Sequence, residues 1–351
     1  MRPVLLLRAL TAGLLAACLA AAPAVAQDKD AAKDKPQTLD NISFGTNWVA
    51  EAEHGGFFQA VADGTYRRYG LDVTIVSGGP NDNNRMLLIA GKIDFFMAAN
   101  TLMSLDAVAN NVPLVSVAAI FQKDPQVFLT HPEARITKLE ELKPLTLFVS
   151  KEGMTSYYQW LKSEYGFSDK NVRPYTFNAQ PFIATAQSAM QGYVTSEPFA
   201  VEKAAGFKPG VILLADAGYN TYSTLIEARV ETVQKKPDLV QRFVDASIIG
   251  WYNYLYGDNS AANAMIKKLN PEMTDELLAY SVAKMKEYGI VDSGDALKDG
   301  IGAMSDERVT NVFQKMVKAG IVKPDIDYRK SYTLRFVNKG VGVELHPGNV
   351  K

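Results

Sequence analysis

Residues 47–56 read NWVAEAEHGG, and this stretch decides how the rest of the chain is interpreted. It follows the strand-like run Ile42–Thr46 and precedes the helix-like run Phe57–Tyr69, which is closed by a glycine. Leu71–Val76 then alternates in the manner of a second strand. The stretch is therefore predicted to be a strand-to-helix loop, which is where α/β proteins place their ligands. Its aromatic and polar residues favour a small-molecule site.

Strands and helices alternate from Asn41 onward, which is typical of βαβ units and of a mostly parallel sheet with helices on both faces. The strands expected in this first series are Ile42–Thr46, Leu71–Val76, Ile93–Met97, Leu114–Phe121 and Gln126–Thr130. The helices expected between them are Phe57–Tyr69, Asn83–Ala90 and Thr101–Ala109.

A second alternating series begins near Lys138. Its expected strands are Leu145–Ser150, Val172–Phe177, Tyr193–Ser196, Val211–Leu214 and Ser223–Ala228. Its expected helices are Thr155–Tyr165 and Phe182–Met190, and a helical region follows with Pro237–Tyr256, Asn259–Lys268, Thr274–Tyr288 and Asp306–Ala319. No internal sequence repeat is found. Two α/β series and a helical return predict two lobes, each built on a sheet, with a ligand cleft between them.

The two lobes are expected to be joined by two crossings, near residues 123–132 and 216–224. The first lobe would then be discontinuous, formed by residues 41–130 and 222–345, and the second lobe would be formed by residues 131–221. Residues 27–40 are charged and low in complexity in their first part, which predicts a disordered tether.

Residues 1–26 have the features of an export signal. Arg2 and Arg8 supply the positive start, an apolar run follows, and Ala24-Val25-Ala26 is a small-x-small cleavage site. Cleavage after Ala26 would give a soluble secreted protein. The alternative is a lipoprotein, because residues 15–18 read LAAC and match a bacterial lipobox whose Cys18 would be lipidated.

Removal of the leader leaves 351 − 26 = 325 residues, and loss of its two arginines takes the formal charge from −1 to about −3. A nucleic-acid partner is therefore not expected. Cys18 is the only cysteine, so the mature chain would have no disulfide, no thiol nucleophile and no cysteine metal site. The three histidines, His54, His131 and His346, have no metal-binding spacing, and no cofactor is expected.

Four segments carry a family resemblance: Asn47–Val76, Lys151–Trp160, Gln191–Phe199 and Tyr219–Arg229. They resemble the solute-binding proteins of bacterial ABC importers, in the branch that includes binders of pyrimidine precursors related to thiamine and of alkylsulfonates or nitrate. The resemblance implies a type II periplasmic-binding fold, a hinged cleft, a periplasmic location, and a permease with its ATPase as partners. A monomer is expected.

The branch shares its fold with the fungal thiamine-pyrimidine synthases, which carry a cysteine-rich motif tied to iron and use a lysine and a histidine. This chain departs from that pattern, because its only cysteine lies in the leader and no lysine occurs between Asn47 and His54. It also has no Gly-x-Ser-x-Gly elbow and no zinc-binding histidine pair. We therefore expect a binding protein and not an enzyme.

The first group of expected ligand-binding residues lies at the ends of two early strands. Trp48 can stack on a flat heteroaromatic ligand, or be a core residue. His54 and Gly55 open a helix whose free N–H groups accept anionic or carbonyl oxygens, although the histidine can also be a cap or a surface residue. Asn100 and Thr101 open the next helix, where either can cap it or face a ligand.

The second group follows the strand that ends at Ser150. A glycine turn and hydroxyl groups at a helix start suit a phosphate, sulfonate or carboxylate, which points to Lys151, Thr155 and Ser156. Tyr157 can add a ring to the cleft. The alternative is an ordinary helix start capped by Thr155.

The third group surrounds residues 191–199, which read QGYVTSEPF. Glu197 is placed to accept paired hydrogen bonds from an amino-heterocycle, or to be a carboxylate favoured by the helix dipole. Asn178 and Tyr193 are weaker candidates. Tyr219 and Asn220 are expected at the second crossing, where they can reach the ligand or serve as a hinge.

These residues predict capture of a small organic solute, with a pyrimidine or related nitrogen heterocycle ranked first. An alkylsulfonate or taurine-type anion binder and a synthase-like enzyme are the alternatives. A sensory role, in which the loaded protein docks on a membrane receptor, is not distinguished from transport by the sequence.

Overall fold

The structure, a computed structural model, describes residues 39–79 and 82–349. The predicted leader, its lipobox and nearly all of the predicted tether lie outside these residues. Within them, no helix combines the length and the apolar character needed to cross a membrane.

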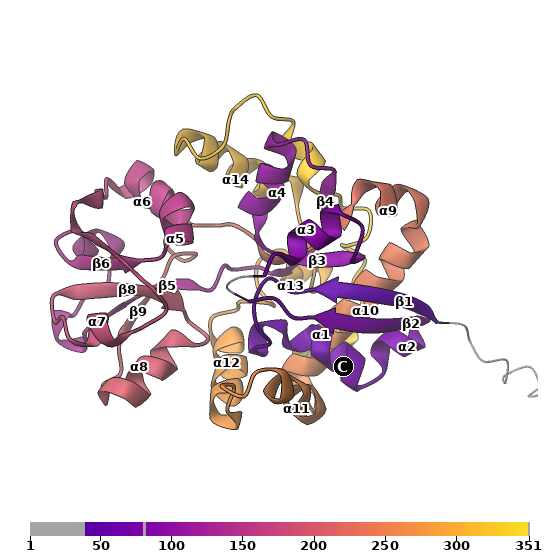
Figure 1. Cartoon of the computed structure of the whole chain (residues 1–351), viewed down its shortest axis with the longest axis horizontal. Helices are drawn as coiled ribbons and strands as arrows, with labels where there is room; N and C mark the ends of the chain where they lie inside the picture. Colours follow the sequence, from indigo (N-terminus) through magenta and orange to yellow (C-terminus); the bar gives the residue numbers. More distant parts are fainter. Residues whose placement is uncertain (1–38, 80–81, 350–351) are drawn as a thin grey trace, which may run out of the picture. The chain divides into compact units, whose positions relative to one another are not determined.

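The first five-stranded sheet has the order β2-β1-β3-β10-β4. Strand β10 runs antiparallel to both of its neighbours, while β1 pairs in parallel with β2 and β3. The strands are β1 (Asp40–Gly45), β2 (Leu71–Val76), β3 (Phe95–Asn100), β4 (Leu114–Phe121) and β10 (Ser223–Arg229). The helices around this sheet are α1 (Gly55–Ala62), α2 (Thr65–Arg68), α3 (Asn84–Ile89), α4 (Thr101–Ala109), α9 (Val230–Lys235) and α10 (Pro237–Tyr256) (Figure 1).

The second sheet repeats this plan with the order β7-β6-β8-β5-β9. Here β5 is the reversed strand, antiparallel to β8 and β9. The strands are β5 (Gln126–Thr130), β6 (Thr146–Val149), β7 (Val172–Pro174), β8 (Ser188–Tyr193) and β9 (Gly210–Leu213). The helices between them are α5 (Lys151–Thr155), α6 (Tyr157–Tyr165), α7 (Gln180–Ile183) and α8 (Glu197–Ala205). The expectation of mostly parallel α/β sheets is confirmed, with one reversed strand in each.

Each reversed strand directly follows a passage of the chain from one sheet to the other. The chain leaves β4 at Phe121 and enters β5 at Gln126, and it leaves β9 at Leu213 and enters β10 at Ser223. Strand β5 therefore belongs to the second sheet, although the expected boundary at residue 130 assigned it to the first half. That the two halves move as separate lobes stays a prediction.

The remaining chain is helical, with α11 (Ser260–Leu269), α12 (Asp275–Glu287), α13 (Ala296–Asp299) and α14 (Asp306–Lys318). Helix α10 packs against α1 at very short range: a Cβ added to Gly56 would lie 2.2 Å from the Trp251 ring, and one added to Gly55 would lie 2.1 Å from the Tyr254 ring. Only glycine fits at these two positions, so both are required for helix packing.

Two sequence predictions on the second sheet are wrong. The predicted helix Phe182–Met190 and strand Tyr193–Ser196 are replaced by the short helix α7 and by strand β8, Ser188–Tyr193. Residues 188–193 read SAMQGY and give little local strand signal, and their strand form comes from pairing with β5 and β6.

A helix beside the first sheet also differs from its prediction. The predicted helix Phe57–Tyr69 is divided, because Gly64 has a left-handed backbone (φ +75°) between α1 and α2.

Candidate functional site

The carboxyl ends of four strands mark the two places where a ligand is expected in this topology. In the first sheet the chain passes from β1 to β2 on one side and then to β3 on the other side, and in the second sheet it passes likewise from β6 to β7 and then to β8. The topological switch points therefore lie between β1 and β3 and between β6 and β8. The segments that follow these four strands are the ones singled out from the sequence. They begin at Thr46, Thr101, Ser150 and Val194.

The segment after β1 is held by backbone and side-chain hydrogen bonds. Thr46 Oγ1 donates to the Trp48 carbonyl over 2.8 Å, and the Gly78 N–H donates to Thr46 Oγ1 over 3.2 Å. Asn84 Nδ2 donates to the Thr46 carbonyl over 2.9 Å. These bonds fix the backbone from which the half-buried Trp48 side chain projects.

Trp48 meets a second aromatic ring that comes from the other sheet. Its ring centroid lies 5.4 Å from that of Phe177, with the planes 39° apart. The Phe177 side chain is 57% exposed although it is large and apolar, and its backbone is left-handed (φ +60°). Such a conformation costs a non-glycine residue about 1–3 kcal/mol and is concentrated at functional sites. An exposed aromatic pair on a strained backbone is therefore a candidate ligand contact.

Three carboxylates from the two sides form what we call the acidic cluster: Glu51, Glu53 and Glu197. Burial, followed by the charges of Glu53 and Glu197, raises the pKa of Glu51 well above its usual value, and the Glu51 side chain is only 17% exposed. Burial also raises the pKa of Glu53, with Glu197 adding to the rise and a hydrogen bond from Thr195 opposing it. The cluster thus brings like charges together in a poorly solvated place.

Glu197 is oriented by the chain just before it. The Tyr193 N–H donates to Glu197 Oε2 over 2.7 Å, and Ser196 Oγ donates to the same oxygen over 2.6 Å. A Cβ on Gly192 would lie 2.6 Å from the Glu197 Cβ, so the glycine makes room for this side chain. Glu197 is the first residue of α8, so it lies at a helix start, but β8 ends four residues earlier, at Tyr193, and not directly before it as predicted.

The two sides of the site are joined through Thr195. Its hydroxyl donates to Glu53 Oε1, and its carbonyl accepts a hydrogen bond of 2.7 Å from Ser281 Oγ on α12. Glu53, Thr195 and Ser281 are all buried. Through its hydroxyl and its carbonyl, Thr195 thus connects the segment after β1, the turn after β8 and the helical return.

His54 lies beside the acidic cluster without a hydrogen bond. Its Nε2 is 3.6 Å from Glu51 Oε1, and neither ring nitrogen hydrogen-bonds to a described residue. The side chain is 1% exposed, and burial lowers its pKa to about 3. The imidazole is therefore neutral near pH 7 and adds no positive charge to its carboxylate neighbours.

A tyrosine and an aspartate extend the negative surroundings. Asp124 lies between β4 and β5, is 3% exposed, and accepts the Gln126 N–H over 3.0 Å. Burial raises the pKa of Asp124 to about 7. Burial, and then Asp124 and all three carboxylates of the cluster, raise the pKa of the Tyr193 hydroxyl. Among the residues that the structure describes, no lysine or arginine forms an ion pair with Asp124 or with the cluster.

The expected anion site after β6 does not have its hydroxyl groups free. Ser150 Oγ accepts the Gly153 N–H over 3.0 Å, which caps the five-residue helix α5. Thr155 Oγ1 and Ser156 Oγ both donate to the Glu152 carbonyl, and Lys151 is exposed. These groups bind their own helix, and no described contact joins them to the acidic cluster.

The remaining predicted residues have structural contacts of their own. Tyr157 is buried, donates to Gln191 Oε1 over 2.7 Å, and contacts the Tyr219 ring edge-on at 6.4 Å. Asn100 caps α4 by accepting the Leu102 N–H, and the Thr101 N–H donates to the Tyr222 carbonyl. Asn178 and Asn220 are exposed; the former accepts the Gln180 N–H, and the carbonyl of the latter accepts from Arg308. Their roles in ligand binding, like that of Gly55, stay predictions.

The structure adds five residues that were not selected as ligand contacts from the sequence: Glu51, Glu53, Asp124, Phe177 and Thr195. The two glutamates are visible in the opening stretch, but only the fold reveals that they meet Glu197. Asp124 and Phe177 lie in stretches without a motif. The left-handed backbone of Phe177 has no sequence signal, because that residue is not a glycine or an asparagine.

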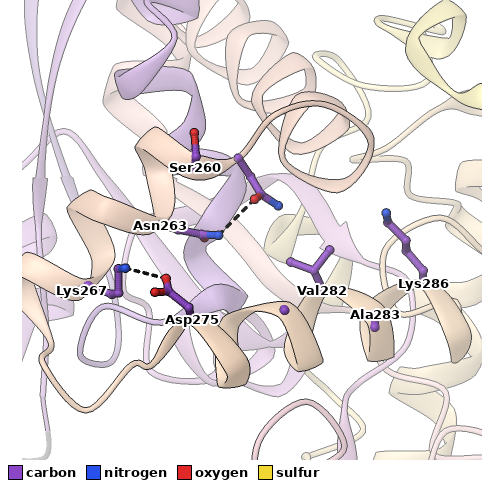
Figure 2. Close-up of a pocket in the computed structure, with 9 residues that line it drawn as sticks. Ser260, Asn263, Lys267, Asp275, Val282, Ala283 and Lys286 are labelled. Atoms are coloured by element: carbon purple, nitrogen blue, oxygen red, sulfur yellow. Dashed lines mark hydrogen bonds and ion pairs between the residues drawn. The ribbon is translucent and has the colours of Figure 1, made fainter.

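A surface hollow of about 630 Å³ lies elsewhere, between α11 and α12. Lys267 pairs with Asp275 there over 2.5 Å, and Asn263 donates a hydrogen bond to Asn259 (Figure 2). Several of its polar groups are thus paired with one another, and none of the predicted site residues lines it. Nor does any group of His, Cys, Asp or Glu within residues 39–79 and 82–349 have the arrangement of a metal site.

Comparison with known proteins gives a consistent picture. A family model described as NMT1/THI5 like matches residues 51–260. The riboflavin-binding protein RibY of Chloroflexus aurantiacus is 21% identical over 349 residues, which cover 95% of this chain and 99% of RibY.

Two solved structures show the same fold. The periplasmic aliphatic sulphonate binding protein SsuA of Escherichia coli superposes with a TM-score of 0.62 at 14% identity, over 83% of this chain and 91% of SsuA. The desulfurization enzyme DSZB has a TM-score of 0.53 at 13% identity, over 85% of this chain and 97% of DSZB. The two-sheet α/β architecture is thus that of the periplasmic binding proteins.

Proposed function

The chain belongs to the NMT1/THI5-like family, and from that premise we propose that it captures a small nitrogen heterocycle in the periplasm for an ABC importer. The solute would be held between the segment after β1 and the turn after β8, where Trp48, Phe177 and the acidic cluster meet. No bond is made or broken in this function; the protein binds and releases.

The observation that carries the proposal is that flat rings and carboxylates come together from the segments that follow β1, β7 and β8. Aromatic side chains bind the face of a planar ring, and a carboxylate accepts hydrogen bonds from ring amino groups. Capture at micromolar concentration needs about −8 kcal/mol, which a few ring contacts and several hydrogen bonds supply. RibY, which covers nearly the same length, is named for binding a flavin, itself a nitrogen heterocycle.

A sulfonate or taurine-type anion is the weaker candidate. SsuA is named for binding sulphonates, but at 14% identity that likeness concerns the fold. In this chain the hydroxyls after β6 are bonded to their own helix, and the carboxylates of the acidic cluster repel an anion. Both features favour a heterocycle.

Binding would require the two sides of the site to part. Glu53 and Thr195 are in direct contact, so a solute that reaches both segments must replace that hydrogen bond. A solute that then contacts both sides favours the closed arrangement, because closure gives it more contacts. The closed form would be what a permease recognises, with its ATPase driving transport.

Calorimetry with a panel of pyrimidines, flavins and alkylsulfonates tests the proposal. We expect a pyrimidine or flavin to bind the wild type, and Trp48→Leu to weaken that binding by about tenfold through loss of the ring contact. Lys235→Ala is the control and should leave binding unchanged, since that side chain is exposed on α9 and pairs with Glu231, outside the candidate site. Tight binding of an alkylsulfonate alone, unaffected by Trp48→Leu, would contradict the proposal.

A further inference from the structure

We propose that the captured solute carries a cationic nitrogen group, an amidinium, guanidinium or protonated amino-heterocycle, and that this group binds the acidic cluster of Glu51, Glu53 and Glu197. The inference rests on the proposed function and specifies the charge of the solute. It concerns the whole group of three carboxylates, which come from the two sides of the site.

The first argument is the missing counter-charge. A buried carboxylate without a partner loses its hydration and gains nothing in return, and a second carboxylate nearby adds repulsion. Burial raises the pKa of Glu51 and that of Glu53, and repulsion by the charge of Glu197 adds to each rise. No described lysine or arginine pairs with any of the three. A cationic group placed here would remove the repulsion and replace the lost hydration.

The second argument is His54, which is independent of the carboxylates. It is 1% exposed, faces Glu51, and has two ring nitrogens without a hydrogen-bond partner among the described residues. A neutral imidazole offers one acceptor nitrogen and one N–H donor. A buried polar side chain left without a partner is costly unless a ligand supplies one. An N–H-rich cation supplies donors both for the imidazole acceptor and for Glu51.

The third argument concerns the shape of the cation. The aromatic pair continues toward the cluster, since the Phe177 ring lies 5.5 Å from that of Tyr175, and Tyr175 is in contact with Glu197. Aromatic faces bind flat cations and stack on delocalised ones. No described group of acidic residues or histidines is arranged to hold a metal ion. A planar organic cation therefore fits better than an inorganic one.

The titratable groups around the cluster come from several elements. They are His54, Asp124, Tyr175, Tyr193 and Tyr254, in addition to the three glutamates. Burial favours the neutral forms of these five surrounding side chains, so none of the five supplies a positive charge near neutral pH. A bound cation would favour the ionised carboxylates, and we expect its binding to release protons to the buffer.

The test uses three probes that share one ring and a planar head but differ in charge: benzamidine (+1), benzamide (neutral) and benzoate (−1). Calorimetry is performed on the full mature protein near neutral pH, in two buffers of different ionisation enthalpy. We expect benzamidine to bind at least about tenfold more tightly than benzamide or benzoate, with proton release. Benzamidine binding no tighter than the other two, or no measurable binding of any probe, would overturn the inference.

Two variants locate the effect. Glu51→Gln and Glu197→Gln keep the side-chain shape, and each is expected to weaken benzamidine by about tenfold while changing benzamide by less than about threefold. Glu231→Gln is the control, because that carboxylate is exposed and pairs with Lys235 on the far helix α9. Because the charge series is also measured on the wild type, a variant that fails to fold does not remove the test. Equal effects of all three substitutions on benzamidine would overturn the assignment.

The failure of this inference is distinguishable from failure of the proposed function. If a dialysed cell extract supplies a solute that the protein retains, but the three probes bind equally, the proposed function stands and the cationic class is wrong. If the protein retains no solute from the extract, the proposed function fails, and the inference fails with it.

Discussion

Two sets of carboxylates in poorly solvated places have opposite surroundings in this protein. Glu227 on β10 is 0% exposed, and it is bound by Arg85 through two hydrogen bonds of 3.0 and 3.1 Å and by Ser104 through one of 3.1 Å. The acidic cluster is bound by hydroxyl and backbone donors and by no described cation. One carboxylate group is complete within the chain, and the other is not.

The difference between the paired Glu227 and the unpaired acidic cluster indicates what each contributes to the protein. Glu227 and Arg85 join β10 to α3, and Arg85 Nη2 also donates to the Met103 carbonyl on α4 over 2.7 Å. A compensated pair of this kind fixes the positions of its elements. An uncompensated cluster weakens the fold, and a protein keeps such groups where a ligand completes them. The predictions below test this contrast, from the largest expected effect to the smallest.

Breaking the paired group should have the largest effect. Arg85→Met leaves Glu227 buried without its partner, and we expect a loss of about 3–5 kcal/mol in the free energy of unfolding. Urea denaturation measures this loss. The double variant Arg85→Met with Glu227→Met is the control and should recover most of the stability, because no buried charge remains. A single variant as stable as the wild type would show that the pair is not required.

An unpaired buried carboxylate should behave in the opposite way, and Asp124 provides the test. Its folded-state pKa is raised to about 7, so the native state holds more protons than the unfolded state between about pH 4 and pH 7. Asp124 therefore destabilises the protein increasingly as the pH rises through that window, and its effect vanishes below it. We expect Asp124→Asn to be more stable than the wild type near pH 8, by up to about 4 kcal/mol, and equal to it near pH 4.

Urea denaturation of the wild type and of Asp124→Asn at both pH values measures the difference in their free energies of unfolding. His54 acts in the other direction, because its lowered pKa makes stability fall as the solution becomes acidic. Its contribution is common to both proteins and cancels in their difference. A stability difference that is the same at both pH values would contradict the assignment to Asp124 ionisation.

The aromatic pair should show the smallest effect on stability and a separate effect on binding. Phe177→Gly removes a non-glycine residue from a left-handed backbone, and we expect a gain of about 1 kcal/mol in the free energy of unfolding. Solute binding should weaken at the same time, since the partner of Trp48 is lost. Thermal unfolding and calorimetry measure the two effects. Loss of stability without any change in binding would identify Phe177 as a packing residue.

The sequence predicted the class of fold and the segments of the site better than the contacts within it. Strand Leu71–Val76 and strand Gln126–Thr130 have the predicted bounds, and Glu197 lies at a helix start. Alternation and glycine punctuation are local signals, so they predict where a loop occurs. They do not predict which loops meet across two sheets.

The errors have the same origin. Strand β8 has a sequence that also suits a helix, and its form depends on pairing with β5 and β6. The local pattern also did not reveal that the hydroxyls of Thr155 and Ser156 donate to the Glu152 carbonyl, and their role in ligand binding stays a prediction. The burial of Glu53 and its hydrogen bond with Thr195 depend on the tertiary fold, so no local sequence pattern predicts them.

The most direct measurement is the identity of the solute that the protein retains. Wild type and the Glu51→Gln, Glu197→Gln double variant are incubated with the same cell extract, separated from free solutes and denatured, and the released solutes are identified by mass spectrometry. We predict that the wild type releases a cationic nitrogen heterocycle in near-equimolar amount and that the double variant does not. An anionic solute, or the same solute in equal amount from both proteins, would contradict the account.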